Sequence, residues 1–389
     1  MADDPDPPDG AAPSVGSPVG LPAGVRRVTA APSLGSPVGL PAGVRRVTAA
    51  PSLGSHASAE PDGDGIEVVT LGECLVALVA SESGPLADAA VFRRHVAGAE
   101  ANVAVGLARL GHRAAFIGRV GDDGFGTAIV RRLRGEGVDV RWLRVEPGSR
   151  TGLMIRERRG AGPSDVVYHR AGSAGSMLGP EDLYTAESDG AFVGARVLHL
   201  TGITPALSPS CHAAVLDAIE RAKAHDVAIT LDLNLRRRLW SDAEAAGALR
   251  PLLASVDVVF GSLDEGVVVG GTSDDAGPRI VAAALIGSGA GHAVLKLGAD
   301  GAASLDSDGT WTVVPGIDGV TVVDPVGAGD AFCAGYLAGQ LEGLDEEEAL
   351  ALGNACGAAV VAVEGDQAGA PTREEARRIG RGGADQTIR

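Results

Sequence analysis

Short apolar runs alternate with longer segments of helical periodicity from residue 66 to residue 365. The run VAITLDLN at 227–234 is nearly continuously apolar, as in a strand that is buried on both faces. The segment before it, SPSCHAAVLDAIERAKAHD at 208–226, has apolar residues at helical spacing. Repeated strand–helix units of this size predict an α/β fold with a doubly wound, mostly parallel sheet flanked by helices. Further predicted strands are 66–72, 114–121, 196–202, 257–262, 293–298 and 302–306, and further predicted helices are 99–111, 124–137, 329–343 and 346–365.

Two stretches, 75–97 and 150–171, interrupt this alternation. Each holds short segments of alternating polarity separated by turn residues, and both are too polar for a central sheet. We therefore expect them to form a small antiparallel β lid at the edge of the main sheet. A lid of this kind can close over a bound substrate and exclude water.

The first 63 residues differ in composition from the rest of the chain. Residues 16–34 recur identically at 35–53, and the whole segment is rich in Gly, Pro, Ala and Ser. Two copies without an apolar face do not make a solenoid, so we expect a disordered low-complexity tail. The VRRV in each copy is compatible with a docking peptide, but a recent duplication or a start codon placed too early is the simpler explanation of the repeat. The folded domain is expected at 64–380, followed by a short tail at 381–389.

The charge balance is strongly acidic, with 50 Asp and Glu against 33 Lys and Arg and a net charge of −17. This excludes the basic surface that nucleic acids or anionic membranes require. No run of 18 apolar residues predicts a transmembrane helix, and the acidic start MADDPDPPDG is unlike a secretory signal. The four cysteines are widely spaced and form no C-x-x-C pair, which indicates reduced thiols in a cytoplasmic protein.

The segment DPVGAGDAFCAGYLAG at 324–339 is the sharpest chemical motif. Its small residues Gly327, Ala328 and Gly329 let backbone N–H groups converge at the start of a predicted helix, where the helix dipole favours anions. Asp330 then places a carboxylate in this anion cradle, where it could accept a hydroxyl proton while the N–H groups bind a transferring phosphoryl group. The simpler alternative is that Asp330 only caps the helix.

Two motifs together resemble a known family. DPVGAGDAFCAGYLAG resembles the C-terminal signature of the ribokinase-like (PfkB) carbohydrate kinases, and VAGAEANVAVGLARLG at 96–111 resembles the N-terminal one. The resemblance runs from about residue 66 to residue 373 and implies the ribokinase-like fold with catalysis by Asp330. The runs TGLMIRE at 151–157, LHLTGITPALSP at 198–209, LDLNLRRRLW at 231–240 and GDQAGAP at 365–371 are similar to those of 2-keto-3-deoxygluconate kinases.

The resemblance also implies a sugar site. The segment with Gly98, Ala99, Glu100 and Asn102 corresponds to the family's sugar-binding loop, although Ala97 stands where the family usually has a second glycine. Arg156, Arg236 and Asp366 match family positions that contact the substrate. An arginine pair suits a sugar acid, because the guanidinium fork binds a carboxylate. For Arg156 and Arg236 the alternative is a solvated surface charge, and Arg236 could instead face the ATP phosphates. For Asp366 the alternative is a turn residue.

A nucleotide and magnesium site is implied in the same way. Asn234 resembles an ATP contact, and KLGADG at 296–301 resembles the nucleotide loop, with Gly298, Gly301, Gly327 and Gly329 leaving room for ATP. Lys296 either contacts a phosphate or only ends a strand. Glu265 matches the superfamily's magnesium-organising Asn-x-x-Glu motif, in which Ser262 replaces the asparagine. ATP and Mg²⁺ are therefore the expected co-substrate and cofactor.

These observations predict an ATP-dependent kinase that phosphorylates the C6 hydroxyl of 2-keto-3-deoxygluconate. Another sugar kinase of the family, such as a fructokinase or ribokinase, is the first alternative, and a non-catalytic sugar-binding regulator is the second. The expected partners are a sugar acid and ATP, with neither nucleic acid nor membrane. A homo-oligomer formed through the lid is also expected from the resemblance.

Overall fold

The computed structural model describes residues 65–158 and 165–381. The predicted tail at 1–63 lies outside the described residues, as does all but Arg381 of the predicted C-terminal tail. None of the helices in the described ranges is long and apolar enough to cross a membrane.

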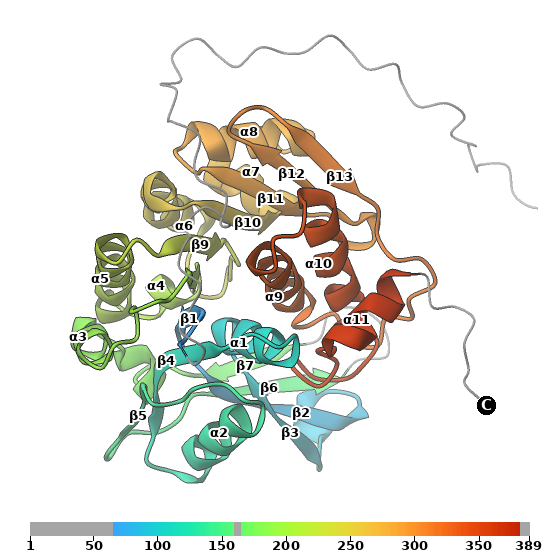
Figure 1. Ribbon diagram of the computed structural model, residues 1–389. Coiled ribbons are helices and arrows are strands. Elements are labelled where there is room, and N and C mark those ends of the chain that lie inside the picture. Colours follow the sequence, from blue (N-terminus) through green and yellow to red (C-terminus); the bar gives the residue numbers. More distant parts are fainter. Residues whose placement is uncertain (1–64, 159–164, 382–389) are drawn as a thin grey trace, which may run out of the picture. The chain divides into compact units, whose positions relative to one another are not determined.

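Nine strands form the main sheet in the order β13-β12-β11-β10-β9-β8-β1-β4-β5 (Figure 1). Every neighbouring pair from β11 to β5 is parallel, and only β11–β12 and β12–β13 are antiparallel. The sheet is mostly parallel, as predicted, because its central strands are largely apolar and are covered on both faces. Its strands are β1 Val68–Leu71, β4 Ala114–Gly121, β5 Leu143–Glu146, β8 Val197–Thr201, β9 Ala228–Asp232, β10 Val258–Ser262, β11 His292–Lys296, β12 Ala302–Asp306 and β13 Trp311–Val314.

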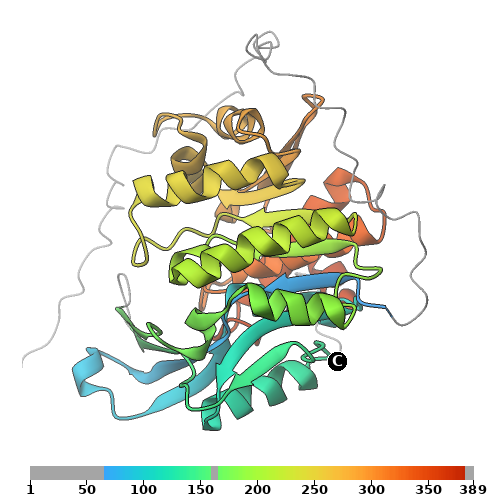
Figure 2. The ribbon, with the colours of Figure 1, turned by 90° about the vertical axis from the view of Figure 1, so that its left-hand side faces the viewer.

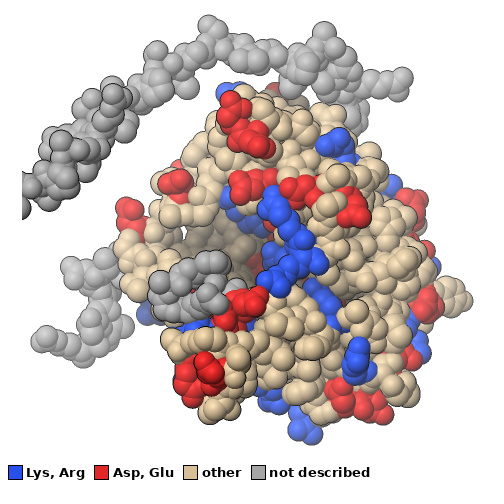
Figure 3. All heavy atoms as spheres, turned by 180° about the vertical axis from the view of Figure 1, so that it is seen from behind, with Lys and Arg blue, Asp and Glu red and all other residues tan. Residues whose placement is uncertain are grey.

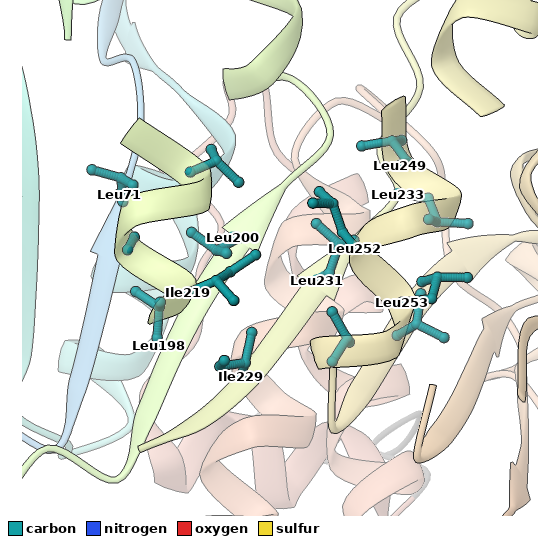
Figure 4. Packing of buried hydrophobic residues seen from close by; sticks show 14 of the residues in the cluster. Leu71, Leu198, Leu200, Ile219, Ile229, Leu231, Leu233, Leu249, Leu252 and Leu253 are labelled. Atoms are coloured by element: carbon teal, nitrogen blue, oxygen red, sulfur yellow. The ribbon is translucent and has the colours of Figure 1, made fainter. Parts of the chain in front are cut away.

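Helices cover the two faces of this sheet, and each face has its own apolar cluster. One cluster joins strand residues to α1, α2, α9, α10 and α11, and the other joins them to α3, α5, α6, α7 and α8. Figure 2 shows α3, α5 and α6 in front of the strands, and Figure 4 shows leucines and isoleucines of the second cluster packed between sheet and helices. The helices are α1 Ala99–Arg109, α2 Gly124–Gly135, α3 Pro180–Ser188, α4 Thr204–Leu207, α5 Pro209–Ala224, α6 Asp242–Leu249, α7 Leu263–Gly270, α8 Pro278–Gly287, α9 Ala328–Leu341, α10 Glu346–Val361 and α11 Arg373–Gly380, with 3₁₀ turns at Leu86–Asp88, Ala174–Met177, Arg250–Ser255 and Gly298–Asp300.

The two stretches predicted as a lid come together in a second, four-stranded sheet in the order β3-β2-β6-β7. The first stretch supplies β2 Leu75–Ser83 and β3 Phe92–Ala97, and the second supplies β6 Leu153–Arg158 and β7 Val166–His169. Each pair is antiparallel, and β2 and β6 join the two pairs by parallel pairing. A small cluster of Leu75, Ala77, Ala97 and Met154 holds the sheet together. The predicted fold class is confirmed in both of its parts.

Candidate active site

The carboxylate of Asp330 lies in the first turn of α9 and is held by two side-chain amides. Asn102 Nδ2 on α1 donates to Asp330 Oδ2 at 2.8 Å, and Asn234 Nδ2 after β9 donates to Asp330 Oδ1 at 3.2 Å. Asn234 reaches it from a left-handed backbone conformation with φ of 38°, which asparagine tolerates better than most residues. Asn102 is in turn fixed by Gln367, whose Nε2 donates to Asn102 Oδ1 at 3.0 Å. The carboxylate is thus oriented by neutral donors.

Burial sets the acidity of this group. Asp330 is only 7% exposed. Burial raises the pKa of Asp330 to about 6, the nearby charge of Asp232 adds to the rise, and the hydrogen bond from Asn102 opposes it. A carboxylate with a pKa near 6 is mostly ionised at neutral pH and is a stronger base than an ordinary aspartate.

Two glycines shape the loop that leads into α9. Gly327 has φ of 83°, and a Cβ there would lie 2.5 Å from the backbone oxygen of Asp366. A Cβ on Gly329 would lie 3.3 Å from the Nζ atom of Lys296. The first N–H groups of a helix have no intrahelical acceptor and carry positive potential. Gly327, Ala328 and Gly329 therefore form a tight turn whose backbone can face an anion.

Lys296 brings a cation to the same place. It ends β11, and its Nζ donates to Asp232 Oδ1 at 2.6 Å. Burial alone would favour the neutral amine, but the charge of Asp232 more than offsets it and raises the pKa of Lys296 above its usual range. Lys296 is thus a charged ammonium group beside the α9 loop.

The two predicted substrate arginines differ in their surroundings. Arg156 on β6 makes a two-pronged ion pair with Asp324, the first residue of the DPVGAGD segment. Arg236 is exposed and has no ion-pair partner among the described residues, although its charge is felt at Asp330. Asp366 is buried, and the charges of Arg156 and Asp324 act on it. Burial, together with the charge of Asp330, raises the pKa of Asp366 to about 7.

The rest of the predicted sugar loop lies at the start of α1. Gly98 has φ of 148°, and a Cβ there would meet the backbone oxygen of Glu73 at 2.4 Å, so the position requires glycine. Ala99 begins α1, and both it and Glu100 are buried. The carboxyl of Glu100 accepts hydrogen bonds from the hydroxyls of Thr201 and Thr204 at 2.7 and 2.5 Å. Burial raises the pKa of Glu100 to about 7. In the structure Glu100 thus links α1 to the end of β8.

The predicted metal residue Glu265 caps α7. Its Oε1 and Oε2 atoms accept the backbone N–H groups of Leu235 and Ser262, each at 2.8 Å, and the Ser262 hydroxyl accepts the N–H of Glu265. Each carboxylate oxygen can still accept a second bond. The described ranges contain no group of three or more His, Cys, Asp and Glu side chains placed to hold a metal ion. The single carboxylate of Glu265 fits an Mg²⁺ ion that is bound mainly through phosphate oxygens and water.

The predicted nucleotide-loop glycines differ in what surrounds them. Gly298 has φ of 63° and faces open space, so a ligand can approach its backbone. Gly301 has φ of 101°, and a Cβ there would meet the backbone oxygen of Val314 at 2.1 Å. Gly301 is therefore required by the turn between β11 and β12.

Several residues of this site were not singled out from the sequence. Asp232 lies inside the LDLN run, Asp324 opens the DPVGAGD segment and Gln367 follows the predicted Asp366. A polar residue at the end of an apolar strand was the available signal for Asp232. The contacts themselves join residues up to 265 positions apart in the chain.

The sequence pattern of the pfkB family carbohydrate kinases matches residues 66–373. A 2-dehydro-3-deoxygluconokinase of Thermoproteus tenax is 39% identical over 325 residues, covering 82% of this chain and 96% of that protein. A protein of the same name from Bacillus subtilis (strain 168) is 37% identical over 316 residues, covering 80% and 94%. A proposed ribokinase II from E. coli, solved in complex with ATP and Mg²⁺, has a TM-score of 0.73 at 28% identity, covering 81% of this chain and 98% of that chain.

The match begins two residues before β1 and ends at the first residue of α11, so it includes both sheets and every residue of the site. The two alignments cover nearly the whole length of these relatives. The resemblance inferred from the two motifs is therefore confirmed, and the chain belongs to the pfkB family of carbohydrate kinases.

Proposed function

We propose that this kinase transfers the γ-phosphoryl group of ATP to the C6 hydroxyl of 2-keto-3-deoxygluconate (2-dehydro-3-deoxygluconate), giving 2-keto-3-deoxy-6-phosphogluconate. The observation that carries the proposal is the buried Asp330 carboxylate, held by Asn102 and Asn234 at the anion-binding start of α9. The substrate is supported by the names of the two relatives at 39% and 37% identity.

The mechanism follows from the positions of these groups. Asp330 accepts the proton of the C6 hydroxyl as its oxygen attacks the γ-phosphorus, and the bond from phosphorus to the bridging oxygen of ADP breaks. A loose phosphoryl-transfer transition state needs positioning and charge neutralisation rather than a covalent intermediate. The N–H groups of Gly327, Ala328 and Gly329 and the ammonium of Lys296 provide that neutralisation. Asn102 and Asn234 keep the base aimed.

The nucleotide would lie along the loop at Gly298, where the backbone is open. Glu265 would hold Mg²⁺ through water, because both of its oxygens already accept one backbone N–H. The ion, when bound, neutralises phosphate charge. Figure 3 shows Lys and Arg side chains gathered along one side of a hollow in the face seen from behind, with Asp and Glu side chains above and below it. In a chain of net charge −17, this row of cations suits anionic phosphates and a sugar acid.

Arg236 is our candidate for the carboxylate of the sugar acid. Arg156 already makes two bonds to Asp324, whereas the guanidinium of Arg236 has no ion-pair partner among the described residues. A bidentate contact from Arg236 would distinguish a sugar acid from a neutral sugar. Arg156 and Asp366 would then bound the sugar site, with Asp366 accepting a hydroxyl as in the family pattern.

We expect the full-length chain to prefer 2-keto-3-deoxygluconate to fructose, ribose and adenosine by ~100-fold or more in kcat/KM, equivalent to ~2.7 kcal/mol. An ADP-release assay with Mg²⁺ and ATP measures this directly. Arg236→Met should remove most of the preference, because it removes the charged partner of the carboxylate. Arg237→Met is the matched control, since Arg237 pairs with Asp242 at the surface. A preference for a neutral sugar would contradict the proposed substrate and leave the kinase assignment in place.

The pKa of Asp330 also predicts the pH dependence of the reaction. Below about pH 6 the carboxyl is protonated and cannot accept the hydroxyl proton. We expect kcat/KM to rise about tenfold per pH unit up to about pH 6 and then to level. In Asp366→Asn the rise in kcat/KM should level at the same pH, because the rise reports ionisation of Asp330. A profile that stays flat between pH 5 and pH 8 would contradict the role of Asp330.

We further propose that the protein acts in the cytoplasm and forms a homo-oligomer through its second sheet. All four cysteines are buried free thiols, as suits a reducing compartment. In the described part of the chain, β3 and β7 are the edges of the second sheet, and Val91 and Val167 near them are exposed. Size-exclusion chromatography with light scattering tests the oligomer, and Val167→Asp should weaken it.

A further inference from the structure

The carboxylate of Asp232 binds both the ammonium group of Lys296 and the side-chain amide of Asn234, which in turn holds the proposed base, Asp330. Asp232 ends β9 and is 1% exposed. Its Oδ1 accepts from Lys296 Nζ at 2.6 Å, across the intervening strand β10. Its Oδ2 accepts from Asn234 Nδ2 at 3.2 Å, and the same Nδ2 atom donates to Asp330. Neither the sequence motifs nor the proposed mechanism assigns a role to Asp232.

The ammonium group of Lys296, which Asp232 binds, lies beside the α9 loop at Gly327–Gly329. A Cβ on Gly329 would lie 3.3 Å from Lys296 Nζ, so the glycine leaves the space that the ammonium group occupies. An ammonium group carries three N–H donors, and the bond to Asp232 uses one of them. The remaining donors can reach an anion bound at the start of α9.

The charge of Lys296 depends on what surrounds it. Burial disfavours an ammonium, and a buried lysine without an acidic partner becomes neutral near physiological pH. Asp232 is the only one of the facing groups that bonds directly to Nζ in the described residues. The titratable groups that face Lys296 are Asp232 on β9, Glu265 on α7, Cys333 and Asp330 on α9, and His199 on β8.

We propose that Asp232 is a positioning residue that keeps Lys296 charged and directed at the α9 loop while it fixes Asn234 on Asp330. The carboxylate of Asp232 thus controls the charge and direction of the Lys296 ammonium group, which meets the transferred phosphoryl group. It also controls the orientation of the base, Asp330. This inference rests on the proposed function for its catalytic consequence, but its first test does not measure activity.

The chain contains only two lysines, Lys223 and Lys296, so their charges can be followed separately. With ¹³C-labelled lysine, the full-length protein gives two Cε signals whose shifts report protonation, and Lys223→Arg assigns them. Lys223 is 44% exposed and pairs with Glu220 at the surface of α5, so its signal is distinct from that of buried Lys296. We expect Lys296 in the wild type to remain charged beyond the ordinary lysine pKa of about 10.4, and Lys296 in Asp232→Asn to lose its proton below it.

The kinetic test uses the same variant. Asp232→Asn should lower kcat by ~10²-fold, as for loss of a preorganised charge, while KM for the sugar changes little. The loss should grow at alkaline pH, where the variant gains a descending limb that the wild type lacks. A merely structural role would lower activity equally at every pH. Asp242→Asn, which breaks the surface pair with Arg237, is the matched control and should show neither effect.

The outcomes separate the two proposals. If wild-type Lys296 loses its proton at or below the ordinary lysine pKa of about 10.4, the inference about Asp232 is wrong, and this result does not require the variant to fold. If Lys296 keeps its charge in Asp232→Asn, the inference is equally wrong. A wild type that phosphorylates none of the sugars overturns the proposed function, while the Lys296 titration still decides whether Asp232 keeps the ammonium charged.

Discussion

Replacing Asp330 with asparagine is expected to lower kcat by ~10³-fold, within the range for loss of a general base. Asparagine has nearly the same shape, so it removes the proton acceptor and leaves the geometry of α9 intact. ATP binding, measured by calorimetry, should change by less than about threefold, because the N–H groups of Gly327–Gly329 and the ammonium of Lys296 remain. An ADP-release assay at saturating sugar and ATP gives the change in kcat.

The same variant should be at least as stable as the wild type at pH 7.5. Burial raises the pKa of Asp330 above its unfolded value of 3.8, so the stability that the protonated form contributes is lost as pH rises through about 6. The neutral asparagine avoids this loss. A variant with near-normal kcat would remove Asp330 from the mechanism, and thermal unfolding shows that any loss is not misfolding.

The central part of the fold could be predicted from the sequence because it is encoded locally. Central strands such as β9 and β11 are short segments with apolar interiors, and helices such as α5 precede them at short distances. The edge strands β5 and β13 were missed, since their partly exposed residues lack an apolar run. The short helices α3, α6, α7, α8 and α11 were missed as well. Eight to ten residues give too few turns for helical periodicity to be distinguished from a buried strand.

The candidate site likewise has a part that could be predicted from the sequence and a part that could not. The turn at Gly327–Asp330 is contiguous, so its conformation and its place at a helix start could be read from the sequence. The bonds that tune it join distant segments: Asn102 and Asp330 are 228 residues apart, and Arg156 and Asp324 are 168 apart. Pairing between such positions is decided by the arrangement of strands and helices. The two arginines therefore looked alike in the sequence and have different environments in the structure.

The ion pair between Arg156 and Asp324 leads to the second large prediction. Arg156 lies on the second sheet and Asp324 precedes the α9 loop, so the pair ties the two together. Their side chains are 11% and 7% exposed. Asp324 also accepts the N–H groups of Val326 and Gly365, each at 3.2 Å. Arg156→Met should lower the free energy of unfolding by ~3–5 kcal/mol, because it leaves Asp324 buried and unpaired. Equilibrium unfolding in urea at pH 7.5 measures this.

The pH dependence of that loss distinguishes an unpaired charge from a simple packing defect. Burial opposes ionisation of Asp324, but Arg156 and the two backbone N–H groups prevail and lower the pKa of Asp324. In the wild type this contributes stability above the unfolded pKa of 3.8, which is lost as pH falls through the lowered folded pKa. In Arg156→Met, burial acts without its main opponent and the pKa of Asp324 rises. The gap between variant and wild type should therefore narrow as pH falls from 7.5 towards 4.

The double variant Arg156→Met/Asp324→Asn completes the cycle. It removes both charges, so it should recover most of the stability that Arg156→Met loses, since neutral replacement of a buried pair is often tolerated. A gap that stays constant with pH, or a double variant no more stable than Arg156→Met, would show that Arg156 contributes by packing alone. If the double variant recovers stability but not kcat, the pair has a second role in catalysis. In that case the α9 loop is folded but lacks the link to β6 that the reaction needs. The cycle thus separates what the pair does for the fold from what it does for the site.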